Sequence, residues 1–207
     1  GIHVLFGLDP EALPNTLNGY LWGECSIAEA AYDVTPESVK ANLGSIHLIP
    51  CSSKLEDITQ VLQEGYDVPL LRQGIKSLIA TLDLDYVFID THPGLNEETL
   101  ICVALSNLMV IVLRPDNQDF QGTAVMVDLA SKLRVPKVLM LVNRVLAKTD
   151  FDSLQRQISQ TYSTPVAGIF PNCDEMMELA SSGLFCLKYP EHPLTHVIRS
   201  VADQLMV

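Results

Sequence analysis

The sequence has few aromatic side chains, few positively charged side chains and no long apolar run. Aromatic residues make up 6% of the chain, with one Trp. The most apolar stretch, LICVALSNLMVIVL at 100–113, is interrupted by Ser106 and Asn107. It is too short to cross a bilayer, which takes about 20 apolar residues. With 48% hydrophobic and 18% charged residues, the composition is that of a globular protein rather than a disordered or fibrous one.

Cations are scarce, because 13 Lys and Arg face 25 Asp and Glu and give a formal charge of -12. This balance argues against nucleic acid as a default partner, since phosphate binding depends on Lys and Arg. Six cations nevertheless lie between residues 132 and 156, where they could form one basic face or simply be solvated helix ends. They are Lys132, Arg134, Lys137, Arg144, Lys148 and Arg156.

Cysteine is also sparse, and the spacing of the cysteines indicates neither disulfides nor a metal site. The five cysteines, at positions 25, 51, 102, 173 and 186, include no C-x-x-C pair and no His at metal-ligand spacing. We therefore expect reduced thiols, a cytoplasmic location and a core position for Cys102. The start at Gly1 carries no basic n-region, so we expect no signal peptide.

A length of 207 residues suits one α/β domain, and no linker or repeat divides the chain. We expect a single domain over 1–207. From residue 46 onward, short apolar runs alternate with helical periodicity, and Asp67 is a predicted N-cap. The predicted strands are 47–50, 86–90, 108–113, 135–145 and 166–170. The predicted helices are 67–82, 96–107, 119–133, 151–162, 174–182 and 193–206.

The predicted strands consist of Val, Ile, Leu and Met with little alternation. Strands of this kind are buried on both faces, as in a parallel sheet covered by helices. The sequence therefore predicts a doubly wound α/β fold with a mostly parallel sheet and helices on both faces.

In such a sheet, function lies in the loops at the carboxyl ends of the strands. Four polar loops qualify: 90–98, 114–122, 143–144 and 171–174. The first begins at Asp90, directly after the apolar run 86–89. Asp90 could start a turn through bonds to nearby amides, or hold a metal ion on a nucleotide phosphate.

Four motifs resemble one family in order and spacing: the strand and loop YVFIDTHPGL at 86–95, IVLRPDNQDFQGT at 111–123, LVNRV at 141–145 and GIFPNCDEMMELASSG at 168–183. Together with the opening GIHVLFGLDP segment, they resemble the MinD/ParA family of deviant Walker A ATPases, in the SIMIBI class of P-loop NTPases. The resemblance spans nearly the whole chain and implies a P-loop NTPase-like fold.

The sequence departs from this family in having no phosphate loop. No G-x-x-x-x-G-K-[ST] motif is present, and Gly74–Ser77 lies inside a predicted helix. We expect the phosphate loop, its β-α-β unit and the catalytic residues in a segment upstream of Gly1.

The resemblance implies a role for each matching residue. Asp90 matches the Walker B carboxylate that holds Mg²⁺, usually through water. Gly94 matches the switch glycine, and Asn143 matches the Asn that contacts adenine. Arg144 could stack on the base or ribose, or form a surface salt bridge. The residues of the loop that closes over the base are Pro171, Asn172 and Asp174.

The resemblance implies ATP and Mg²⁺ as ligands and an ATP-hydrolysing switch that acts in intracellular positioning or partitioning. It further implies a homodimer on ATP binding, an activator protein and possible nonspecific DNA contact through the 132–156 cations. The chain end HVIRSVADQLMV has one Arg and predicts no membrane anchor. The alternative is a non-catalytic recruitment module with a degenerate or absent phosphate loop. A bridging iron-sulfur cluster is disfavoured, because the loops DTHPGLNEET and RPDNQDFQGT contain no Cys.

Two further residue groups have simpler interpretations. Met176 and Met177, with Leu179 and Ala180, are expected to pack within their helix rather than line a partner groove. His92 is expected to face solvent or to form local hydrogen bonds rather than to act as a base.

Overall fold

The computed structural model describes residues 2–9, 13–52, 54, 56, 57, 59, 65, 67–91 and 94–206. The chain divides into two compact units. The first comprises residues 1–90 with 181–183, and the second comprises 91–180 with 184–207. The single domain expected from the sequence therefore stays a prediction.

The first unit contains a 3-10 helix, η1 (Ile2–Phe6), and the helices α1 (Leu17–Leu21), α2 (Glu37–Lys40) and α4 (Val68–Leu82). α4 confirms the helix predicted at 67–82. Asp67 is its N-cap, and its carboxylate accepts a hydrogen bond from the Leu70 amide at 2.9 Å. Gly74 is buried in the middle of α4, so the rejection of Gly74–Ser77 as a phosphate loop is confirmed.

Two short strands of the first unit, β1 (Tyr32–Asp33) and β2 (His47–Leu48), pair antiparallel in a sheet of their own. The prediction that 47–50 belongs to the parallel sheet was wrong. The chain between β1 and β2 turns back locally, and Thr35 Oγ1 accepts a hydrogen bond from the Ile46 amide at 2.8 Å. This local return favours antiparallel pairing, whereas parallel neighbours need a longer crossover.

The apolar run 86–90, predicted to be a strand, forms no strand. Its side chains are exposed, with Tyr86 at 49% and Phe88 at 75%. A β-strand requires backbone partners on a neighbouring strand. Within the described part of the chain, no strand pairs with this run, which explains the difference from the prediction.

The second unit contains a parallel sheet of β3 (Leu108–Leu113), β4 (Lys137–Val145) and β5 (Val166–Pro171), in the order β3-β4-β5. The crossovers contain α6 (Asn117–Lys132) and α7 (Phe151–Tyr162), and α5 (Glu97–Leu105) precedes β3. These elements confirm the predicted strands and helices between residues 96 and 170 to within a few residues. The largest shifts are of about two residues. α6 begins at Asn117 rather than near residue 119, β4 begins at Lys137 rather than 135, and α5 ends at Leu105 rather than 107.

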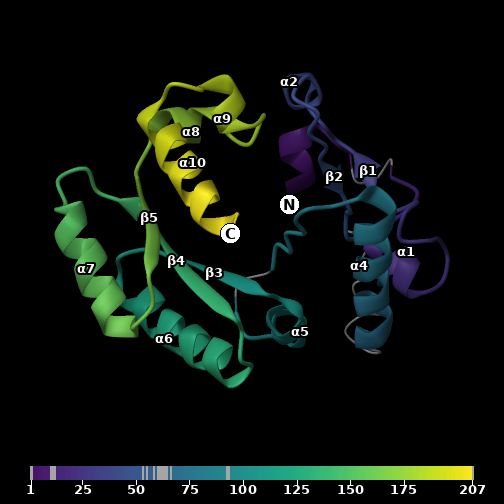
Figure 1. Ribbon diagram of the computed structural model, residues 1–207, viewed down its shortest axis with the longest axis horizontal. Coiled ribbons are helices and arrows are strands. Elements are labelled where there is room, and N and C mark those ends of the chain that lie inside the picture. Colours follow the sequence, from purple (N-terminus) through teal and green to yellow (C-terminus); the bar gives the residue numbers. More distant parts are fainter. Residues whose placement is uncertain are drawn as a thin grey trace. The chain divides into compact units, whose positions relative to one another are not determined.

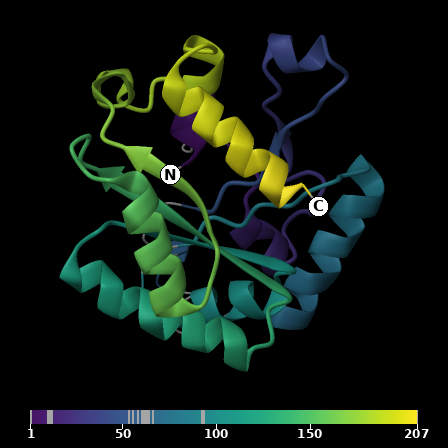
Figure 2. The same cartoon turned by 60° about the vertical axis from the view of Figure 1, so that its left-hand side comes forward.

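Helices cover both faces of this sheet (Figure 1; Figure 2). On one face, Ile111, Leu113 and Met140 pack with side chains of α6 and α7. On the other, Leu139 and Ala167 pack with Val201 of α10 (Pro193–Leu205). The parallel α/β architecture predicted from the sequence is therefore confirmed.

The chain after β5 forms α8 (Asp174–Leu179), α9 (Phe185–Lys188) and α10. The sequence did not predict α9. Leu179, Phe185 and Leu194 form a small core that joins the three helices. Met177 is 65% exposed, so the expected packing of this side chain was wrong. Across the described residues, no helix combines the length and apolarity needed to cross a membrane.

Candidate functional site

Three polar segments meet at the carboxyl edge of the β3-β4-β5 sheet. Leu113 of β3 lies opposite Val142 of β4, so the residues that follow them, Arg114 and Asn143, occupy neighbouring positions. On the other side of β4, Val145 lies opposite Pro171 of β5. The sheet thus brings three of the four predicted loops to one edge, as expected for a parallel sheet.

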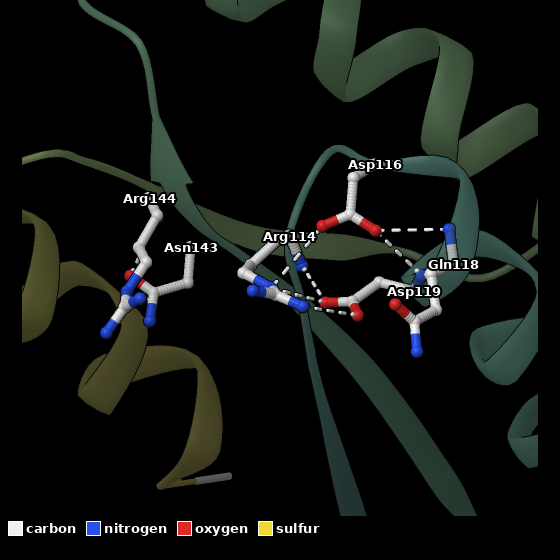
Figure 3. A network of polar contacts seen from close by, with 6 residues as sticks. All are labelled: Arg114, Asp116, Gln118, Asp119, Asn143 and Arg144. Atoms are coloured by element: carbon white, nitrogen blue, oxygen red, sulfur yellow. Dashed lines mark hydrogen bonds and ion pairs between the residues drawn. The ribbon is translucent and has the colours of Figure 1, made fainter.

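A compact ion-pair network shapes the turn between β3 and α6 (Figure 3). Asp119 binds the Arg114 guanidinium with both carboxylate oxygens, at 3.1 Å to Nε and 3.1 Å to Nη2. The same carboxylate accepts the Arg114 backbone N–H at 2.8 Å. Asp116 caps α6 by accepting from the amides of Gln118 and Asp119. The network therefore fixes the direction in which the chain leaves β3.

Charge pairing in this network changes the acidity of its members. Hydrogen bonds from the Arg114 side chain and backbone hold the pKa of Asp119 below its ordinary value. In return, the Asp119 carboxylate raises the pKa of Arg114. Because Arg114 is already paired with two carboxylates, it has a structural role here and is poorly placed to bind a phosphate.

A bulge at the end of β4 positions Asn143 and Arg144. The pairing of β4 with β5 shifts register between Val142 and Val145, and Arg144 adopts a left-handed conformation with φ +57. The Asn143 side-chain oxygen accepts the Arg144 backbone N–H at 2.9 Å. Left-handed backbone costs a non-glycine residue about 1 kcal/mol or more and occurs often at binding sites.

The orientation of the Asn143 amide follows from this hydrogen bond. Because Oδ1 is occupied by the Arg144 amide, the Nδ2 group is left as a donor at the sheet edge. Nδ2 has no acceptor among the described residues. Figure 3 shows Asn143 and Arg144 together at this edge, beside the Arg114 turn.

The loop after β5 is attached to the end of β4. The Asn172 amide donates a hydrogen bond to the Val145 carbonyl at 2.9 Å. Asn172 and Asp174 are exposed, and Asp174 is the first residue of α8. Pro171, Asn172 and Asp174 therefore lie close to Asn143 and Arg144, as the sequence predicted for loops of one edge.

The remaining predicted site residues, Asp90 and Gly94, lie on the segment before α5. Gly94 has φ +110, a conformation that side-chain-bearing residues rarely adopt, so this position favours glycine. Asp90 is exposed and belongs to the first unit, whereas Gly94 belongs to the second. His92 and Pro93, between them, lie outside the described residues.

The six cations at 132–156 do not form one face. Lys132 pairs with Asp128 at 2.7 Å, and Lys137 donates to the Gln204 carbonyl at 2.7 Å, both near the amino edge of the sheet. Arg144 lies at the opposite end of the nine-residue strand β4. At about 3.3 Å per residue, Lys137 and Arg144 are roughly 23 Å apart along the strand.

The Arg114–Asp119 pairing was missed in the sequence. The loop 114–122 was recognised as polar, but the pairing of its charges was not predicted. The signal was the spacing R-x-D-x-x-D, which places one carboxylate at a helix N-cap and the next three residues later in the first turn.

Comparisons with known proteins support this architecture through structure rather than sequence. No protein-family model matches the chain, and no curated protein matches it significantly. Solved structures do match. MinD from Pyrococcus horikoshii, complexed with Mg-ADP, aligns with a TM-score of 0.76 and 20% identity over 98% of this chain and 76% of that one.

Two further structures give similar values. MinD in the MinC:MinD cell division protein complex of Aquifex aeolicus aligns with a TM-score of 0.75 and 16% identity over 98% of this chain and 77% of that one. A ParA family ATPase from Chlorobium tepidum aligns with a TM-score of 0.70 and 16% identity over 97% and 79%. The chain therefore has the α/β fold of the MinD and ParA ATPases, and the resemblance seen in its motifs is confirmed at the level of fold.

Proposed function

We propose that this chain is part of an ATP-binding and ATP-hydrolysing switch of the MinD/ParA type, acting in intracellular positioning or partitioning. The observation that supports the proposal most strongly is the meeting of Asn143, Arg144 and the 171–174 loop at the carboxyl edge of a MinD-like sheet. Ligands of open α/β sheets bind at this edge.

The residues at the carboxyl edge of the sheet are suited to bind the base of the nucleotide. The Nδ2 donor of Asn143, which has no acceptor among the described residues, can bind an acceptor nitrogen of adenine. Arg144, held on the bulge, can stack on the base or ribose, and Pro171, Asn172 and Asp174 can cover the base from the loop after β5. These roles are proposals that rest on the geometry and on the resemblance.

Asp90 and Gly94 are suited to bind Mg²⁺ and the phosphates of the nucleotide. A carboxylate is a ligand type that Mg²⁺ prefers, and the exposed Asp90 can hold Mg²⁺ directly or through water. Mg²⁺, when bound, neutralises the charge of the phosphates. Gly94 can bring its backbone close to the γ-phosphate because it has no side chain.

Measurement of Mg²⁺-dependent ATP hydrolysis by the natural protein tests the metal role. Asp90→Ala should lower the rate by at least about tenfold, since it removes a charge that holds the metal. Asp85→Ala is a matched control, because Asp85 is an exposed carboxylate at the other end of the same apolar run. Equal rates for the Asp90 and Asp85 variants would remove Asp90 from the site.

The affinity for ATP tests the base site separately. Asn143→Ala should raise the dissociation constant by about fivefold to tenfold, because a hydrogen bond to the base contributes about 1 kcal/mol. The matched control is Asn107→Ala, since Asn107 is exposed at the opposite edge of the sheet, just before β3. If both substitutions weaken binding equally, the base does not bind at the carboxyl edge.

The second candidate function is a non-catalytic recruitment module, which applies if the phosphate loop of the full-length protein is degenerate or absent. The two functions differ in turnover: a module binds its partner without hydrolysing ATP. The switch also predicts an ATP-dependent homodimer and an activator protein. A structure similar to this chain is a MinC:MinD cell division protein complex, which supports binding to a partner protein. Nonspecific DNA binding has weak support, because the cations at 132–156 lie at opposite edges of the sheet.

A further inference from the structure

Three side chains of different chemistry meet where α8 and α10 begin. The atoms that Cys173, Glu175 and His192 could offer as ligands all lie within 4.8 Å of one another. The Cys173 thiol donates to Glu175 Oε2 at 3.3 Å, and His192 Nε2 lies 3.8 Å from the same oxygen. Neither His192 nor this grouping was singled out by the sequence, because 16 residues, which include α9, separate Glu175 from His192.

These distances fit the coordination sphere of a small metal ion. Zinc binds sulfur at about 2.3 Å and nitrogen or oxygen at about 2.0–2.2 Å, so ligand atoms of a tetrahedral site lie roughly 3.3–3.7 Å apart. The sulfur-to-oxygen and oxygen-to-nitrogen distances are already close to these values. All three atoms lie within 4.8 Å of one another, so an ion between them requires a closing movement of roughly 1 Å or less.

The donor set selects the class of metal. Thiolate and imidazole favour Zn²⁺ and related borderline ions, whereas Mg²⁺ and Ca²⁺ require sites built mainly from oxygen. We infer that Cys173, Glu175 and His192 form a binding site for a divalent ion of the Zn²⁺ class, beside the proposed nucleotide site, since Cys173 belongs to the 171–174 loop. The side chain of Glu175 is 49% exposed, so the fourth coordination position faces solvent and can take water or a ligand from a partner.

Metal binding competes with a helix cap. In the metal-free protein His192 is the N-cap of α10, and its Nδ1 accepts the Leu194 amide at 3.1 Å. Nδ1 is therefore unprotonated and the imidazole proton is on Nε2, facing Glu175. For Nε2 to bind the ion, this proton must be lost and Nδ1 must take up a proton, so the Leu194 amide loses its acceptor. The competition lowers the affinity and links the ion to the first turn of α10.

The number of protons released on metal binding depends on whether the Cys173 thiol is protonated in the metal-free protein. Burial and the neighbouring Glu175 carboxylate raise the pKa of Cys173, so the metal-free form carries a thiol. The ion displaces the thiol proton, while the imidazole proton moves from Nε2 to Nδ1 through solvent. Binding therefore releases one proton to solvent per ion. The bound ion would join the start of α8, at the end of the 171–174 loop, to the start of α10.

Titration with Co²⁺, a spectroscopic substitute for Zn²⁺, tests the site in the reduced protein. We expect tetrahedral visible bands and a thiolate-to-cobalt charge-transfer band, which Zn²⁺ then displaces. Cys173→Ser should abolish the charge-transfer band. Cys186→Ser is the matched control: it removes a neighbouring half-buried thiol outside the group and should leave the band unchanged.

His192→Asn separates ligation from capping, because Asn is a good N-cap but offers no imidazole. This variant should keep α10 and weaken Co²⁺ binding at least about tenfold, as should Glu175→Gln. In the wild-type protein, Zn²⁺ should also speed hydrogen exchange of the Leu194 amide. A charge-transfer band that survives in Cys173→Ser, or Co²⁺ affinity that is unchanged in both other variants, would overturn the site. Neither result depends on nucleotide binding.

Discussion

Two apolar runs of this chain, 86–90 and 108–113, have similar compositions and different structures. Both consist mainly of large hydrophobic residues, and both were predicted to be strands. The second is β3, bonded along its whole length to β4, with Leu113 only 1% exposed. The first has no strand partner among the described residues, and Phe88 is 75% exposed. Hydrophobicity thus identified both runs, and only a neighbouring strand made one of them part of a sheet.

The outer edge of the sheet shows how a strand is protected without a neighbour. β5 is the last strand of the order β3-β4-β5, and glutamine side chains bond two of its carbonyls. Gln155 of α7 donates to the Val166 carbonyl at 3.0 Å, and Gln204 of α10 donates to the Ala167 carbonyl at 2.8 Å. Such side-chain bonds satisfy backbone groups that would otherwise recruit another strand.

The largest difference between the two runs should appear in hydrogen exchange. The β3 amides bonded to β4 should exchange only when the sheet opens, which takes up to the full free energy of unfolding, about 5–15 kcal/mol. The amides of 86–90 should exchange almost as fast as in an unfolded peptide. Mass spectrometry of peptides covering each run measures both. Comparable protection of the two would show that 86–90 has a backbone partner and would break the comparison.

The next largest difference between the two runs should be the loss of stability when one large side chain in each is truncated. Leu113→Ala leaves a cavity in the core between the sheet and α6 and should lower the free energy of unfolding by about 2–5 kcal/mol. Phe88→Ala should change it by less than about 0.5 kcal/mol, because the ring is exposed. Urea denaturation followed by circular dichroism gives both values. A large loss in Phe88→Ala would mean that its ring is buried in solution.

A smaller effect is expected at the contact between β5 and α10. A Cβ at Gly168 would lie 2.6 Å from Val201 Cγ2, so Gly168→Ala should cost about 1–3 kcal/mol through overpacking. Gly122→Ala in α6 is the matched control, since its Cβ would meet nothing within 4 Å, and it should stabilise the protein by about 0.5–1 kcal/mol. Val201→Ala combined with Gly168→Ala should recover part of the loss. If the double variant regains no stability, the loss in Gly168→Ala does not come from the contact with Val201.

The smallest effect concerns the Arg114–Asp119 pair, which fixes the turn after β3. The pKa of Asp119 is lowered in the folded state, so its stabilisation is present above the unfolded value of about 3.9 and is lost as pH falls through the folded value. Asp119→Asn should be slightly less stable than wild type at neutral pH and lose less stability on acidification. Melting temperatures between neutral pH and about pH 3 measure this, with Asp128→Asn on the exposed face of α6 as control. Parallel curves for wild type and Asp119→Asn would contradict the assigned role.

Much of the second unit was predictable because its signals are local. α7 was predicted with its exact bounds, since Asp150 caps it and its apolar stripe has helical spacing. The ends of β3 and β5 and the Asn143–Arg144 and 171–174 segments were recognised from motif and composition. The fold class followed, because strands apolar on both faces require helices on both sides.

What could not be predicted depended on contacts between distant segments. The antiparallel β1-β2 pair, the exposure of Met177 and the role of His192 each depend on neighbours that the local sequence does not specify. The bulge at Asn143 is another case, because a register shift exists only relative to β5.

The sequence by itself therefore determined where helices begin, which runs are apolar and which loops are polar, because capping and periodicity act within a few residues. Tertiary structure alone decided which apolar run became a strand, which polar side chains share an edge and which cysteine meets a histidine. Backbone pairing and side-chain clusters join residues far apart in the chain, so their energies depend on the whole fold.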